Sequence, residues 1–210
     1  MKRITDFIVI VAVVAITHAF FDFIQFEYLT AFNNTIYMSV LFIPAAVRVF
    51  SVILFGYWAG LGIASGVFLH DFYIHPVQNT QFEMLVSILQ QGAGASFSLL
   101  IWAMISKKVS GFANPNINFS DIDAFDVLQM CLIQAVVNST TAHGYYIWSS
   151  TINHQFDIYY YVVMLVGDLT GSFLFFIMAN LIFSLLMRTG FISRRYYEDT
   201  GKSEFVWLKR

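Results

Sequence analysis

Long apolar stretches, repeated along the whole chain, constrain its fold more than any other feature. Each is about 18 residues long or longer, which is enough for a helix to cross a membrane. They cover approximately Phe7 to Phe26, Ile36 to Phe55, Tyr57 to Ile74, Phe82 to Ile105, Ala124 to Trp148 and Ile158 to Met187. Continuous apolar runs are typical of buried helices rather than of alternating strands. The sequence therefore predicts an all-α polytopic membrane helix bundle with about six transmembrane helices.

The composition agrees with a membrane domain. Of the 210 residues, 58% are hydrophobic and 11% are charged, whereas a soluble domain is about half apolar and a quarter charged. We expect one transmembrane domain over residues 1–187, with the lipid bilayer as its first partner, and a basic, aromatic tail over 188–210. The net charge of −2 and the lack of a basic patch outside the tails give no indication of nucleic-acid binding.

The positions of the basic residues predict the orientation. Ten of the eleven Lys and Arg residues fall at the N-terminus, after the fourth span or in the tail, and the eleventh is Arg48. With both termini in the cytoplasm, all ten lie on the cytoplasmic side, as the positive-inside rule expects for six spans.

Three ionisable residues lie inside apolar spans: Asp22, Arg48 and Asp168. His18 precedes Asp22 by four residues, so the two share a helical face. A charge at such depth costs about 2.5–3.5 kcal/mol on insertion scales and normally faces a partner or a wet cavity. Three interpretations stay open: an ion pair of Arg48 with Asp168 or Asp22 that fixes helix register, a pocket for an anionic or zwitterionic ligand, and a path for ions or protons.

The fourth and fifth spans carry uncharged polar residues. Gln90 and Gln91 lie near the centre of the fourth span, and Gln134, Asn138 and Thr141 form one face of the fifth. Such residues either hydrogen-bond between helices or line a pocket. The candidate ligand-binding residues are Arg48, Asp168, Asp22, His18, Gln91 and Asn138.

Nothing in the sequence predicts catalysis, a metal or a cofactor. His70 and His75 are five residues apart, which is not the signature of a zinc site. The single cysteine, Cys131, lies in an apolar run and is expected to be a small packed residue. Because nucleophile, phosphate-binding and dinucleotide motifs are missing, we expect a protein that is not an enzyme.

Small residues predict close helix packing. Gly56 and Gly60, and Gly62 and Gly66, are each four apart, a spacing that lets helix backbones approach. We expect these four glycines to support self-association or contact with another membrane protein. Pro44 is expected to kink the second span, and Ser120 to cap the fifth.

Two stretches together resemble the MASE1 family of membrane sensor domains. The first is Leu41-Phe42-Ile43-Pro44-Ala45-Ala46, followed by Leu54-Phe55-Gly56 and the glycine-rich helix that ends Gly62-Ile63-Ala64-Ser65-Gly66. The second, Gly167-Asp168-Leu169-Thr170-Gly171, is similar to the late Gly-Asp-x-x-Gly motif of that family. The likeness covers about two thirds of the chain, and it carries Pro44, Asp168 and Gly171 over from the family.

This resemblance implies a sensory domain of the bacterial inner membrane, usually fused to a histidine kinase or a cyclic-di-GMP enzyme. The chain departs from the family pattern because Phe42 and Ile43 replace the tryptophan and the first proline, six spans replace eight, and no output domain is expected. The predicted function is a stand-alone sensory or adaptor protein that binds a small ligand or a membrane partner through a buried polar pocket. The alternatives are a small-molecule transporter component, like the substrate-binding S-components of energy-coupling-factor importers, and a non-catalytic accessory subunit of a membrane complex.

Overall fold

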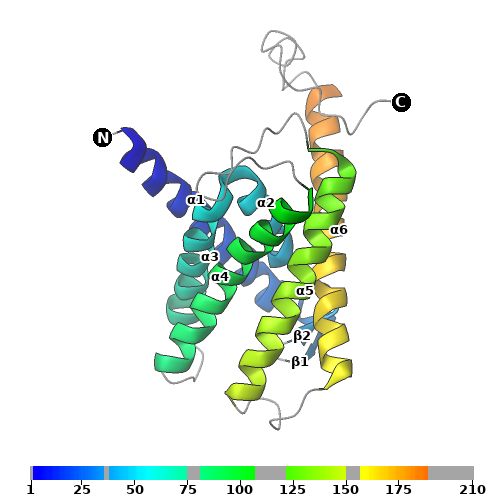
Figure 1. Ribbon diagram of the computed structural model, residues 1–210. Helices are drawn as coiled ribbons and strands as arrows, with labels where there is room; N and C mark the ends of the chain where they lie inside the picture. Colours follow the sequence, from blue (N-terminus) through cyan, green and yellow to red (C-terminus); the bar gives the residue numbers. More distant parts are fainter. Residues whose placement is uncertain (1, 36–37, 75–80, 107–121, 150–156, 189–210) are drawn as a thin grey trace.

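The apolar stretches form a bundle of helices in the computed structural model, which describes residues 2–35, 38–74, 81–106, 122–149 and 157–188 (Figure 1). The main helices are α1 (Lys2–Tyr28), α2 (Pro44–Phe55), α3 (Ala59–Leu69), α4 (Gln81–Ser106), α5 (Ala124–Trp148) and α6 (Ile158–Arg188). The shorter elements are the 3₁₀ turns η1 (Thr30–Phe32) and η2 (Gly56–Trp58), the π-helical turn η3 (His70–Ile74) and the antiparallel strands β1 (Asn33–Thr35) and β2 (Met38–Ser39).

Four of the predicted spans match helices closely, namely α1, α4, α5 and α6. The predicted cap of α5 is different. Asp123 caps the helix by accepting a hydrogen bond from the backbone N–H of Asp126, and the Asp126 carboxylate accepts one from the backbone N–H of Asp123, both at 2.9 Å. Ser120 lies outside the described residues.

The prediction for the second span is wrong. Helix α2 begins at Pro44 and not near Ile36, so the proline starts a helix instead of kinking one. Proline suits the first helical turn because its missing N–H would have no partner there and its φ is already helical. With 12 residues, α2 is about 18 Å long at 1.5 Å per residue, which is less than the roughly 30 Å of a bilayer core.

This short helix lies at the centre of the bundle. It contacts each of α1, α3, α4, α5 and α6, and nine of its twelve residues are buried. The other helices pack in series, α1 on α3, α3 on α4, α4 on α5 and α5 on α6. Helix α2 has its most extensive contacts with α6 and α1, the two ends of this series. The chain leaves α2 at Gly56, whose φ of 66° is a backbone conformation that suits glycine.

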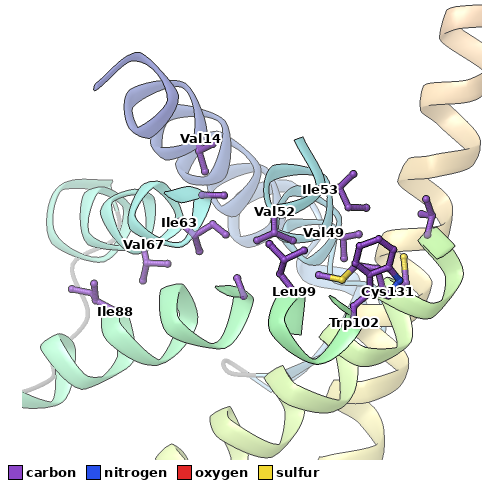
Figure 2. Close-up of a cluster of buried hydrophobic side chains, with 14 residues drawn as sticks. Val14, Val49, Val52, Ile53, Ile63, Val67, Ile88, Leu99, Trp102 and Cys131 are labelled. Carbon is purple, nitrogen blue, oxygen red and sulfur yellow. The ribbon is translucent and has the colours of Figure 1, made fainter. Parts of the chain in front are cut away.

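The apolar core forms where α2 meets its neighbours. Figure 2 shows Val49, Val52 and Ile53 of α2 beside Leu99, Trp102 and Cys131. Cys131 is 1% exposed, which confirms it as a small packed residue.

Glycines on α3 make close contacts inside the chain. A Cβ on Gly60 would overlap α4 at Gly92, one on Gly62 would overlap Val14 of α1, and one on Gly66 would overlap Ala15 and His18 of α1. These surfaces of Gly60, Gly62 and Gly66 are occupied by the protein's own helices, and Gly56 serves the turn. Association with another copy or another membrane protein therefore stays a prediction that these glycines do not support.

Among the described residues, four segments are long and apolar enough to cross a membrane: Thr5–Tyr28, Pro44–Ile74, Gln81–Ser106 and Ile158–Leu186. The chain thus has the helices of a membrane protein. The segment Pro44–Ile74 contains the third predicted span and the part of the second from Pro44 onward, and α5 is not among the four. The low hydropathy of α5 comes from its buried side, since Gln134, Asn138 and His143 are buried while Leu132 and Val136 are exposed.

Candidate functional site

Arg48 is the centre of the candidate site. It lies on α2, one turn after Pro44, and is 2% exposed. Its Nε donates a hydrogen bond to Nε2 of His18 at 3.3 Å, and its Nη2 donates to Oε1 of Gln91. The guanidinium carbon lies 5.3 Å from the centre of the Phe42 ring, within the range of a cation–π contact. The remaining nitrogen, Nη1, is buried and has no hydrogen-bond partner among the described residues.

The hydrogen bonds around His18 define its tautomer. An arginine Nε–H is always a donor, so Nε2 of His18 must accept and carries no proton. The proton of the ring is then on Nδ1, which lies 2.8 Å from Oδ2 of Asp22. The imidazole is therefore neutral in this arrangement and links the guanidinium to the Asp22 carboxylate.

Asp168 lies on α6 and is 3% exposed. Its Oδ2 accepts a hydrogen bond of 2.7 Å from Nδ2 of Asn138 on α5. No second hydrogen bond reaches this carboxylate from the described residues.

The ion pair considered for Arg48 does not form. Among the described residues, no carboxylate oxygen lies within 4 Å of its guanidinium. Arg48 instead uses the neutral acceptors His18 and Gln91, and Asp168 uses the neutral donor Asn138. The rotation of α2 about its axis explains these partners, because it directs the Arg48 side chain toward α1 and α4, which carry the two acceptors.

Further polar atoms in the bundle lack partners. Both Nε2 and Oε1 of Gln134 are buried without a hydrogen bond from the described residues, and so is Oγ of Ser139. Gln134 precedes Asn138 by one helical turn, so both lie on the same face of α5. Folded proteins satisfy the great majority of buried polar side-chain atoms with protein or water, so this face needs additional partners.

An irregular segment before α2 positions the site. Gln25 of α1 holds it from one side, because Oε1 accepts from the backbone N–H of Ile43 and Nε2 donates to Oγ of Ser39, both at 3.1 Å. Helix α6 holds it from the other side, where the backbone N–H of Phe42 donates to the carbonyl of Gly167 at 3.0 Å.

Two glycines of α6 make this contact feasible. A Cβ on Gly167 would overlap the Ser39 carbonyl, and one on Gly171 would overlap the Phe42 carbonyl. The two glycines of the Gly-Asp-Leu-Thr-Gly stretch thus allow the non-helical backbone before α2 to pack directly on α6. Asp168 lies between these glycines, beside the start of α2.

His70 forms a separate polar contact at the end of α3. Its Nδ1 lies 2.9 Å from Oδ1 of Asp71, and its ring stacks on Phe26 with the centroids 5.2 Å apart. The described part of the chain contains no group of three or more His, Cys, Asp or Glu side chains placed to hold a metal ion. His75, the second histidine considered in the sequence, lies outside the described residues.

The structure brings the six candidate residues into two groups of side chains in polar contact. One group runs from Asp22 through His18 and Arg48 to Gln91, and the other is the pair of Asn138 and Asp168. Sequence reasoning did not find the role of Gln25 in holding the start of α2. The sequence gave little indication of this role, because polar residues such as Gln25 are common near the end of a helix.

Polar side chains of four helices, α1, α4, α5 and α6, lie around α2, which carries Arg48. A function is assigned on the basis of this arrangement. Comparison with protein-family models, with curated proteins and with solved structures finds no match for the chain.

Proposed function

We propose that this chain is a sensory or adaptor protein of the bacterial inner membrane that holds a small ligand at Arg48. The ligand carries a carboxylate or a comparable acceptor group, which binds Nη1 of the guanidinium. The observation that carries this proposal is that Nη1 is buried and lacks a partner, although Nε and Nη2 each donate a hydrogen bond. A buried charged donor without a partner costs more than about 1–3 kcal/mol, so an acceptor that enters the site is strongly favoured.

The position of Arg48 supports an input site. Its helix contacts every other long helix of the bundle, so a change at Arg48 is transmitted to all of them through direct packing. In this proposal, the ligand alters the packing of α2, and the altered bundle is recognised by a partner protein. The likeness to MASE1 sensor domains supports the same assignment, and the positive-inside rule places both termini in the cytoplasm.

A transporter component is the second candidate. The interruption of the helical backbone before Pro44 favours it, because transporters bind substrates at broken helices near the middle of the membrane. Uptake of a solute by proteoliposomes, or co-purification with an ATPase and a coupling subunit, would support this candidate over the sensor. The accessory-subunit alternative requires no ligand and would be favoured if none is found.

Native mass spectrometry of gently extracted protein tests the proposal. We expect the unaltered protein to retain a small molecule that is lost from the Arg48→Gln variant. Gln90→Ala is the matched control, because Gln90 bonds to Thr141 and not to Arg48. A folded Arg48→Gln variant that retains the same molecule would contradict the proposal.

A further inference from the structure

A groove along the outer side of α4 contains none of the residues that bind Arg48. It is bordered by Tyr57 of the turn η2 and by Thr141 of α5, the helix that packs along α4 (Figure 1). Its volume is about 800 Å³, within the roughly 300–1,000 Å³ of known ligand pockets. The groove is therefore large enough to hold a small molecule or part of a lipid.

The floor of the groove suits a hydrocarbon chain. It is formed along α4 by Ala93, Gly94, Phe97 and Leu100, and none of the described residues that line it is charged. A Cβ at Gly94 would come no closer than 3.7 Å to Thr141 and 3.9 Å to Val137. The surface is thus hollow at Gly94 because a side chain is missing there, and not because another helix fills the space.

Polar side chains that bond to each other close one end of the groove. Nε2 of Gln90 donates a hydrogen bond to Oγ1 of Thr141 at 2.6 Å, and the Thr141 hydroxyl donates to the Val137 carbonyl at 2.8 Å. Gln90 lies near the middle of α4, which is long and apolar enough to cross a membrane. This end of the groove therefore lies toward the centre of the bilayer.

Tyr57 borders the other end, and its hydroxyl oxygen is buried without a hydrogen-bond partner among the described residues. The Tyr57 backbone carbonyl accepts a hydrogen bond from Oγ of Ser96 at 3.1 Å, which fixes the turn against α4. The next residue, Trp58, is 57% exposed, and its ring lies 5.0 Å from that of Phe7, near the start of the apolar segment Thr5–Tyr28. Because Tyr and Trp are enriched where hydrocarbon meets the lipid headgroups, this end of the groove lies toward a membrane surface.

We propose that the groove holds one acyl chain of a phospholipid from the surrounding bilayer, and that an ester carbonyl of this lipid accepts a hydrogen bond from the Tyr57 hydroxyl. The groove opens on the outer side of a membrane-spanning helix, so bilayer lipids reach it directly. A phospholipid carries its ester carbonyls next to its hydrocarbon chains, which is the order of polar and apolar groups along the groove. Buried hydroxyl groups nearly always have a partner, and the ester supplies one to Tyr57.

Native mass spectrometry of the delipidated full chain in detergent tests the inference. The chain is titrated with dioleoyl phosphatidylglycerol and with its diether analogue, which has the same headgroup and the same chains but lacks the ester carbonyls. We expect the first ester lipid to bind about 2- to 12-fold more tightly than the first diether lipid, the range for one hydrogen bond.

Variants assign the contacts. Tyr57→Phe removes only the hydroxyl, so it should lower the affinity for the ester lipid to that for the diether lipid and leave the latter unchanged. Ala93→Phe places a ring in the groove from an exposed position and should weaken binding of both lipids at least about tenfold, the effect of losing contact with two or more CH₂ groups. Tyr28→Phe and Ala12→Phe are the matched controls, because both residues are exposed on α1, and they should bind as the unaltered protein does.

Three outcomes would overturn the proposal. Equal binding of the two lipids, with no effect of Tyr57→Phe, would show that Tyr57 does not bond to an ester. Unchanged lipid binding in a folded Ala93→Phe variant would show that the lipid lies elsewhere. A dimer of the unaltered chain that Ala93→Phe dissociates would show that a second copy occupies the groove. The comparison of the two lipids uses the unaltered chain, so it gives an answer even if a variant does not fold.

Discussion

At the scale of single residues, the buried guanidinium of Arg48 depends on neutral acceptors. Gln91→Ala removes the acceptor of Nη2 and leaves a buried charged donor unpaired. We expect a loss of about 1.5–3 kcal/mol of unfolding free energy, the range for a hydrogen bond to a charged group. Gln90→Ala removes a bond between two neutral side chains and should cost about 0.5–1.5 kcal/mol. Unfolding in detergent, followed by tryptophan fluorescence, measures both variants, and equal losses would contradict the assigned role of Gln91.

The tautomer of His18 is a second prediction at this scale. Because Nε2 accepts from Arg48 and Nδ1 faces Asp22, we expect the neutral ring with its proton on Nδ1. Nitrogen-15 NMR of histidine-labelled protein distinguishes the two ring nitrogens, and the His18→Gln variant identifies the signal. A proton found on Nε2 would mean that Arg48 does not bond to this ring.

The buried charged residues could be predicted from the sequence, but their pairing could not. Charges inside apolar spans are costly, and this alone led to Asp22, Arg48 and Asp168. Their partners depend on how each helix is rotated about its axis. From the sequence, Asp168 or Asp22 was expected to pair with Arg48, whereas the structure pairs it with His18 and Gln91. The choice of partner depends on which neighbouring helices the Arg48 side chain faces, and it faces α1 and α4.

At the scale of elements, the long helices could be predicted because apolar length and capping residues are local signals. The second span could not, because its apolar residues extend through a non-helical segment. Pro44 is compatible with a kink or with a helix start, and the choice depends on α1 and α6, which bind the backbone before it. The glycines at 167 and 171 were recognised as a motif, but their contact with that segment is a tertiary feature.

This contact yields a prediction for α6. Gly171→Ala places a Cβ against the Phe42 carbonyl, so we expect a loss of about 1–3 kcal/mol, as in other over-packed interiors. Gly144→Ala is the matched control. A Cβ at Gly144 meets no atom within 4 Å, and alanine is favoured over glycine within a helix by about 0.5–1 kcal/mol.

Unfolding measurements on the two variants compare the same chemical change in two surroundings. Opposite signs are the expected result: Gly171→Ala destabilises and Gly144→Ala is neutral or stabilising. A harmless Gly171→Ala would show that the segment before α2 does not rest on α6.

At the scale of the whole molecule, the open question is the path of α5 across the membrane. Its 25 residues are about 37 Å long at 1.5 Å per residue, enough to span a bilayer core of about 30 Å. It is less apolar than the other long helices because it carries more polar residues, and Gln134, Asn138 and His143 among them are buried. Its exposed side carries Leu128, Leu132 and Val136, which suit contact with lipid. We therefore expect α5 to cross the membrane with its polar face toward the bundle.

Cysteine labelling tests this topology. In a Cys131→Ala background, Ser106→Cys marks the end of α4 and Ser149→Cys marks the residue after α5. If α5 crosses and both termini are cytoplasmic, a membrane-impermeant maleimide added outside intact cells should label residue 149 and not residue 106. Lysed cells provide the control, because both sites should then react. Labelling of the two positions from the same side would mean that α5 does not span, and the buried polar face would need another explanation than packing within a membrane bundle.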